Sequence, residues 1–233
     1  MASRIVFLPA ENNSSLLFQE KVVNFEWVAG IAKSQAIKSI KNLHLESKKL
    51  LKIMSMLEIS TKSNNLLGFA LSAFNLKISH EDTLVLLESL YQASKVFEGG
   101  GPFLDLIVKD PITAKQDTRL RINGNISGYK YENISWPVKK SPNFYDFLYI
   151  KALLQFPDRR TISDYEAFTD IAFSQTSLNF NPKRSYNCQA RSVAIYRTLV
   201  ERMEEKEILS FLAQVCTKED SGSTHFIQGY LDE

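Results

Sequence analysis

Apolar positions recur with a helical period over residues 82–97, DTLVLLESLYQASKVF. One face to bury is predicted by four residues at this spacing: Leu86, Leu90, Ala93 and Phe97. Asp82 is typical of a helix start, and the glycines at 99–101 are typical of a helix end. We therefore expect a single helix over residues 82–97.

Polar residues follow the same spacing on another face of this predicted helix: Glu88, Tyr91, Gln92 and Lys95. Two helical turns would place Glu88 and Lys95 roughly 10 Å apart along the axis, close enough to flank one small ligand. A solvated helix face is the alternative interpretation, because most polar stripes on helices face water.

The remaining pattern predicts mainly helices with a few short strands, an α+β fold. Strands are expected at 4–10 and 23–27, and irregular structure at 58–65 and 125–140. Residues 66–78 fit a strand or a short helix. Helices are expected at 34–57, from Pro111, and at 144–156, 163–173, 187–203 and 206–215. We expect one domain, in which residues 1–57 form an N-terminal extension of the same globule as residues 58–233.

Composition narrows the class of protein. The chain has 233 residues, of which 44% are hydrophobic and 23% charged, as in an ordinary globular protein. Its net charge of +2 does not by itself indicate a nucleic-acid or membrane partner. No apolar run is long enough for a membrane span, and the N-terminal run is too short for a secretory signal. Cys188 and Cys216 form no metal-binding spacing and no disulfide framework, so they fit a reducing cytoplasm with both thiols packed; a disulfide between them is the alternative. We expect a cytoplasmic protein that binds no metal or cofactor.

Three short segments, in order, resemble signatures of the NADAR (YbiA-like) family. Residues 88–97, ESLYQASKVF, resemble E-x-x-Y/F-Q-A-x-K-F, with Val96 where Phe is usual. Residues 71–75, LSAFN, resemble L-S-N-F, with Ala73 where Asn is usual. Residues 114–119, AKQDTR, resemble A-K-x-x-G-R, with Thr118 in place of Gly.

Three further blocks resemble one branch of that family, the antitoxins paired with DarT-type toxins. These blocks are EISTKS at 58–63, FYDFLY at 144–149 and NCQAR at 187–191. The resemblance then runs from about residue 58 to residue 202. The family ending T-G-x-x-x-L-x-E does not occur in this sequence.

The resemblance implies an enzyme that removes ADP-ribose from guanine bases in DNA and so reverses a DarT-type toxin. Its partners would be ADP-ribosylated DNA and that toxin, with no membrane involved. Two alternatives remain open. One is an N-glycosidase acting on a ribosylated intermediate of the riboflavin pathway, and the other is a non-catalytic module that binds ADP-ribose.

Carboxylates, lysines and aromatics are the residues that suit this chemistry, since the sequence contains no nucleophilic-hydrolase, P-loop or zinc motif. Cleavage of a bond between ribose and a base builds positive charge on the sugar. A carboxylate stabilises that charge or activates water, and an acid protonates the leaving base. Glu88 suits the first role. Lys95 suits the second, or helps to hold the diphosphate.

Substrate contacts are expected from the family blocks and from the polar loop at 58–65. The alternative interpretation is that this loop is polar only because surface loops generally are. Trp136 is a candidate for stacking on a base. Asp146 is either a pocket residue or the partner of a buried base such as Lys151 or Arg159. The full set of candidate binding residues is Glu58, Ser60, Lys62, Ser63, Asn75, Tyr91, Gln92, Arg119, Trp136, Asp146, Tyr149 and Arg191.

Overall fold

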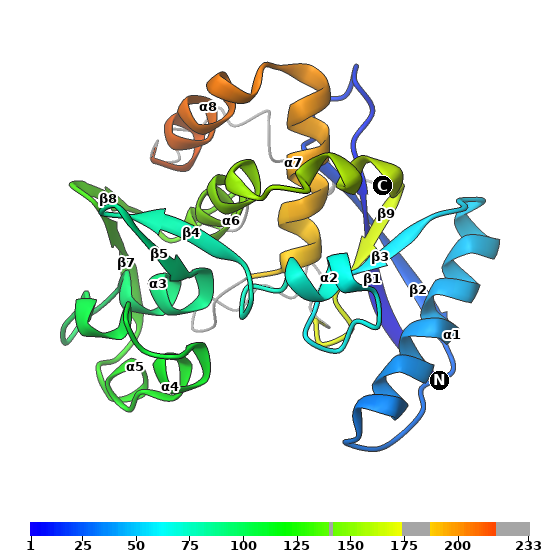
Figure 1. The fold of residues 1–233 in the computed structure, drawn as a ribbon, viewed down its shortest axis with the longest axis horizontal. Helices are drawn as coiled ribbons and strands as arrows, with labels where there is room; N and C mark the ends of the chain where they lie inside the picture. Colours follow the sequence, from blue (N-terminus) through cyan, green and yellow to red (C-terminus); the bar gives the residue numbers. More distant parts are fainter. Residues whose placement is uncertain (140–141, 174–186, 218–233) are drawn as a thin grey trace.

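The computed structural model describes residues 1–139, 142–173 and 187–217. Within them, a four-stranded sheet forms one side of the molecule (Figure 1). Its strands in spatial order are β2 (Phe18–Phe25), β1 (Ala2–Pro9), β9 (Ala167–Thr169) and β3 (Met56–Glu58). β1 is antiparallel to both β2 and β9, and β3 is parallel to β9. Strands that are far apart along the chain are therefore neighbours in one sheet.

Helices cover both faces of this sheet, as the alternation of side chains along β1 requires. Val6 points to the face covered by α1 (Lys33–Leu51), in a core that includes Ile40 and Leu43. Ile5 and Phe7 point to the other face, toward α7 (Gln189–Arg202). The sheet is thus buried on both sides.

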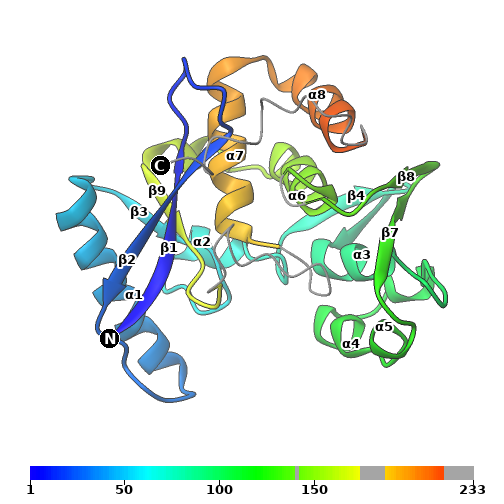
Figure 2. The same cartoon turned by 180° about the vertical axis from the view of Figure 1, so that it is seen from behind.

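Two further helices continue the main core away from the sheet. α6 (Phe144–Gln155) packs beside α7, and α8 (Glu205–Thr217) packs against α6. Both views place α6 and α7 between the four-stranded sheet and two small sheets (Figures 1 and 2). The small sheets are β4–β5 (Lys77–His80 and Thr83–Leu86) and β6–β7–β8 (Lys95–Phe97, Ile126–Tyr131 and Ile134–Trp136).

Short helices connect these layers: α2 (Leu66–Ala70), α3 (Leu87–Ala93), α4 (Pro111–Gln116) and α5 (Arg119–Ile122), with 3-10 turns at Leu104–Leu106 and Arg159–Asp164. α3 lies against α4 and α6. It therefore stands at the junction between the central helices and the small β6–β7–β8 sheet.

The prediction of one helix over residues 82–97 is wrong. Glu81 and Asp82 both have positive φ and form the turn of the β4–β5 hairpin, so Asp82 does not cap a helix. α3 begins only at Leu87 and ends at Ala93. The chain then enters β6, where Lys95 pairs with Tyr129 of β7. The β4–β5 hairpin replaces the start of the predicted helix, and pairing of β6 with β7, far along the chain, replaces its end.

Three other predicted elements also differ. The helix expected over 34–57 ends at Leu51, after which Lys52 adopts a left-handed conformation and the chain turns into β3. Leu50 and Met54, two of the apolar residues that recur at helical spacing in this stretch, are exposed. The irregular stretch at 125–140 contains β7 and β8, and the helix expected at 163–173 contains β9. In each case pairing with a distant strand outweighed the local pattern.

The helices expected at 144–156, 187–203 and 206–215 are confirmed as α6, α7 and α8, and the helix beginning at Pro111 is confirmed as α4. The two N-terminal strands are confirmed as β1 and β2, although Trp27 lies beyond the end of β2. The fold is α+β, as the pattern predicted. No helix in the described ranges is both long and apolar enough to cross a membrane.

Candidate active site

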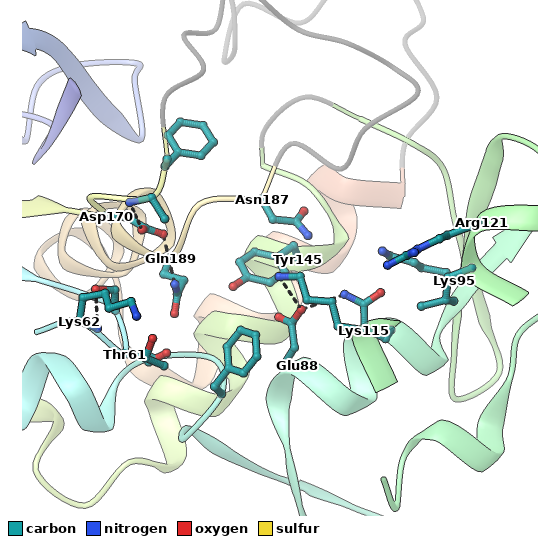
Figure 3. A pocket seen from close by; sticks show the side chains of 17 residues that line it. Thr61, Lys62, Glu88, Lys95, Lys115, Arg121, Tyr145, Asp170, Asn187 and Gln189 are labelled. Atoms are coloured by element: carbon teal, nitrogen blue, oxygen red, sulfur yellow. Dashed lines mark hydrogen bonds and ion pairs between the residues drawn. The ribbon is translucent and has the colours of Figure 1, made fainter. Parts of the chain in front are cut away.

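A cavity of about 520 Å³ opens where α3, β6, α4 and α6 meet the loops that follow β3 and β9 (Figure 3). This volume falls within the range of about 300–1,000 Å³ that is typical of small-molecule sites. Most of the residues that line the cavity have polar side chains, and they include both acids and bases. Three of the charged residues that line it are Glu88, Lys95 and Lys115.

Glu88 lies in the first turn of α3 and is buried. Gln92, one turn later, donates a hydrogen bond of 2.8 Å from Nε2 to Oε1 of Glu88. The ammonium of Lys115, from α4, lies 3.3 Å from the same oxygen. Since both contacts are made by Oε1, Oε2 of Glu88 accepts no hydrogen bond from the described residues and remains available to a ligand.

Lys95 is the first residue of β6, and its side chain is buried against the cavity. Its ammonium lies 4.9 Å from the centre of the Tyr91 ring. Burial lowers the pKa of Lys95 to about 8; the charge of Glu88 opposes this shift and that of Lys115 adds to it. A lysine in this range exchanges a proton readily near neutral pH.

Cations gather on the Glu88 side of the cavity. Lys115 and Arg121 join Lys95 there, as Figure 3 shows. The Lys115 side chain is about half exposed, and its ammonium also lies 5.1 Å from the centre of the Phe74 ring. Three cations around one opening suit a ligand that carries phosphate groups.

The opposite wall is the loop after β3, where Ser60, Thr61 and Lys62 line the cavity. Glu58 holds this loop from behind: Ser60 Oγ donates to its Oε1 at 2.7 Å, and the backbone N–H of Lys62 donates to Ser60 Oγ. A Cβ on Gly68 of α2 would lie 2.0 Å from the backbone oxygen of Glu58. Glycine at this position therefore lets α2 pack directly against the base of the loop.

A second acid, Asp170, lines the cavity from the segment after β9. Gln189 at the start of α7 donates from Nε2 to Oδ2 of Asp170 at 3.1 Å. Oε1 of the same Gln189 accepts a hydrogen bond of 2.6 Å from the backbone N–H of Ala73. Gln189 thus joins Asp170 to the loop that follows α2.

Five of the predicted site residues line this cavity: Ser60, Lys62, Glu88, Gln92 and Lys95. Glu58 supports the wall without lining it. Glu88 and Lys95 flank one cavity, although they lie on a helix and a strand rather than on one continuous helix.

Arg119 does not line the cavity. Its guanidinium is held by Asp105 at 2.7 Å and Asp117 at 2.9 Å, and it lies over the ring of Phe103. Arg121, two residues later, takes the place in the cavity that was expected for Arg119.

The predicted aromatic contacts lie in the core. Trp136 is buried against Phe144 and Phe147, with ring centres 5.4 and 4.5 Å away, and it lines a separate, smaller cavity. Tyr149 is also buried, and its hydroxyl donates to the backbone oxygen of Leu71. Tyr91 is packed under Lys95. None of the three lines the cavity of Glu88.

Asp146 and Arg191 form a buried ion pair between α6 and α7, with 3.1 Å between Oδ2 and Nη2 and both side chains 0% exposed. The partner of Asp146 is therefore Arg191, and not Lys151 or Arg159 as expected. Ser63 is buried and accepts a hydrogen bond from the backbone of Asn65. Asn75 donates to the backbone of Phe69. The side chains of Asp146, Arg191, Ser63 and Asn75 thus each interact with another part of the protein.

The sequence pattern missed several lining residues. Some belong to blocks that resemble the NADAR family, so a signal existed for Lys115, Tyr145, Asn187 and Gln189. Asp170 had none, because the segment around it reads as a helix. Ser72 lines the cavity as well, and its buried hydroxyl has no hydrogen-bond partner among the described residues.

Within the described ranges no group of His, Cys, Asp and Glu side chains is arranged to hold a metal ion.

Among known families, the model of the DarT1-associated NADAR antitoxin matches residues 2–223. No curated protein matches the chain. The match covers nearly the whole sequence, including the segments that build the cavity. The chain belongs to the family of DarT1-associated NADAR antitoxins.

Proposed function

We propose that this protein is an ADP-ribosyl glycohydrolase that removes ADP-ribose from guanine bases in DNA, and that it thereby counteracts a DarT-type toxin. The observation that carries this proposal is the placement of Glu88 and Lys95 in one polar cavity, in a member of an antitoxin family. A protein that only bound its ligand would not need a buried acid and a buried base in one cavity.

The geometry supports distinct roles for the two residues. Glu88 is ion-paired through Oε1 while Oε2 is free of protein hydrogen bonds, so a negative oxygen is available to a sugar that becomes cationic. Lys95, with its lowered pKa, suits the transfer of a proton to the departing base.

Charge also supports a phosphate-bearing substrate. Lys115 and Arg121 lie on one side of the cavity, and Lys62 lies on the opposite wall. Lysine and arginine donate charge-assisted hydrogen bonds to phosphate oxygens. ADP-ribose carries a diphosphate, and a DNA substrate adds backbone phosphates near the opening.

The direct test is to incubate the purified protein with an oligonucleotide that carries ADP-ribose on guanine, and with a matched one that carries it on thymine. We expect free ADP-ribose from the guanine substrate and little from the thymine substrate. Because no toxin is present, release would demonstrate enzymatic reversal, as opposed to toxin neutralisation by binding.

Other outcomes would replace the proposal. Tight binding of ADP-ribose without release would indicate a binding module. Turnover only of a ribosylated riboflavin intermediate would indicate an N-glycosidase of the riboflavin pathway. Equal turnover of guanine and thymine substrates would remove the base preference.

A further inference from the structure

Two carboxylates line the cavity, and they differ in their partners. Glu88 has Lys115 within ion-pair distance. Asp170 has no lysine or arginine within that distance among residues 1–139, 142–173 and 187–217; its oxygens are held by neutral donors instead. Two acids in different environments are suited to different tasks in one reaction.

Resting on the glycohydrolase function proposed above, we propose that Asp170 is the general base of this site, accepting the proton of the water that attacks the ribose. This leaves Glu88 to stabilise the cationic sugar and Lys95 to protonate the departing base. The sequence pattern gave Asp170 no role.

The side chain of Asp170 is held in one orientation. Oδ1 accepts a hydrogen bond of 3.1 Å from the backbone N–H of Ala172, and Oδ2 accepts one of 3.1 Å from Gln189. Because Gln189 Oε1 accepts from the backbone of Ala73, its amide orientation is set, and Nε2 must donate to Asp170. A base held in this way needs no reorganisation before it accepts a proton.

Figure 3 shows how the two acids are placed. The labelled side chain of Tyr145 lies between Asp170, with Gln189, and Glu88. The charges of both acids raise the pKa of the Tyr145 phenol, which burial already raises well above its usual value. The two carboxylates therefore flank a shared volume that a protonated phenol borders.

Burial raises the pKa of Asp170 to about 6, against the opposing effects of its hydrogen bonds and of Lys115. A base with this pKa is mostly ionised at neutral pH and is still basic enough to accept a proton. Glu58, directly behind the loop, has its pKa raised to about 8 by burial and by the charge of Asp170. Asp170 interacts electrostatically with these titratable or charged groups: Arg4, Glu58, Lys115, Tyr145, Tyr149 and Cys188.

The reaction is balanced with water as the only co-reactant. As the water oxygen bonds to the anomeric carbon, one water proton passes to the carboxylate of Asp170. The bond from that carbon to the base nitrogen breaks, and its electron pair leaves with the base, which takes a proton from Lys95. Asp170 then loses its proton to solvent and Lys95 regains one, so both return to their starting states.

Chemical rescue by azide tests this role. Azide attacks without losing a proton, so it does not need a base. In Asp170→Ala, turnover of the guanine-linked substrate should fall by about 10²–10⁴-fold. Added sodium azide should restore it and yield ADP-ribosyl azide, which mass spectrometry identifies. Glu88→Gln should lose activity without rescue, because the cationic sugar is no longer stabilised.

A second variant separates catalysis from structure. Asp170→Asn keeps the side-chain volume but cannot accept the proton. The wild-type rate should rise as the pH increases through about 6, because the base must be ionised, and this limb should vanish in Asp170→Asn. Asp164→Asn, the same change at an exposed position outside the cavity, serves as the matched control and should keep the wild-type profile.

Full activity of both Asp170 variants would overturn the inference. Lost activity without azide rescue, together with an unchanged acid limb in Asp170→Asn, would do the same and would make Asp170 a structural residue. In either case an active wild-type protein leaves the glycohydrolase proposal intact. A wild-type protein that releases no ADP-ribose would overturn both.

Discussion

The ammonium nitrogen of Lys115 lies 3.3 Å from Oε1 of Glu88 and joins α4 to the first turn of α3 across the cavity. The same oxygen accepts a hydrogen bond from Gln92. Two donors on one oxygen orient the carboxylate so that its other oxygen is left for the substrate. In the proposed reaction, Lys115 would therefore act through the position of Glu88, in addition to any contact with phosphate.

Loss of this ion pair should slow the reaction without unfolding the protein. In Lys115→Met, Glu88 loses its partner, and we expect turnover to fall by about 10–100-fold. Because the Lys115 side chain is about half exposed, the melting temperature should change little. Lys115→Arg keeps a cation at this position and should retain most of the activity. Equal losses in both variants would mean that the charge of Lys115 is not what matters.

The pH dependence of turnover should identify the role of Lys95. As an acid, Lys95 must be protonated, so the rate should fall as the pH rises through about 8, the pKa that burial gives it. Lys95→Met should cut turnover by about 10²–10⁴-fold and remove this limb. Melting curves on the variant would confirm that it is folded.

A lysine that attacks the ring-opened sugar would behave in the opposite way, because only the neutral amine forms a Schiff base. The rate would then rise as the pH increases through about 8. Borohydride added during turnover would leave an ADP-ribose adduct on Lys95 that mass spectrometry detects. Absence of such an adduct would leave Lys95 a role as a general acid or in electrostatic stabilisation only.

Trp136→Ala should affect stability and not ligand binding. The indole is buried between Phe144 and Phe147, outside the cavity of Glu88. Truncation of a buried Trp to Ala typically costs about 3–5 kcal/mol in the free energy of unfolding. Denaturant unfolding should show this loss, while calorimetry should give an unchanged affinity for ADP-ribose. Weaker binding by a folded variant would restore the ring-stacking role suggested by its sequence context.

The ion pair of Asp146 and Arg191 should be essential for the fold. Asp146→Ala leaves the guanidinium of Arg191 buried without its carboxylate, which typically costs about 3–5 kcal/mol. It also removes the acceptor for Ser192 Oγ. The matched control is Arg159→Ala, which breaks a more exposed pair with Glu205 and should cost about 1 kcal/mol or less. Similar urea midpoints for the two variants would contradict this structural role.

Local pattern predicted the elements whose backbone hydrogen bonds are made within one continuous segment. The apolar run at 144–156 and the amphipathic stretches at 187–203 and 206–215 are helices, as expected. It failed where strands pair: residues 83–86 join the neighbouring β4 in a hairpin, and Lys95 joins the distant β7, in segments that read as one helix. A short sequence window carries no information on a distant partner such as β7.

Prediction of the candidate site likewise succeeded for residues in one short motif and failed for residues whose partners lie on other elements. Glu88, Gln92 and Lys95 were found because they form one compact motif, and all three line the cavity. Asp146 looks like a site residue in the sequence, since a charge in an apolar run signals either a pocket or a buried pair. Arg191 was a candidate because it belongs to the block at 187–191 that resembles the antitoxin family. Only the packing of α6 on α7 shows that they satisfy each other.

The most direct measurement is the release of ADP-ribose from a guanine-modified oligonucleotide by the wild-type protein and by Glu88→Gln. This substitution keeps the size of the side chain but deletes its charge. Since the carboxylate matters most when the sugar becomes cationic, we predict that turnover falls by about 10²–10⁴-fold while ADP-ribose affinity changes far less. A folded Glu88→Gln protein with full activity would contradict the account.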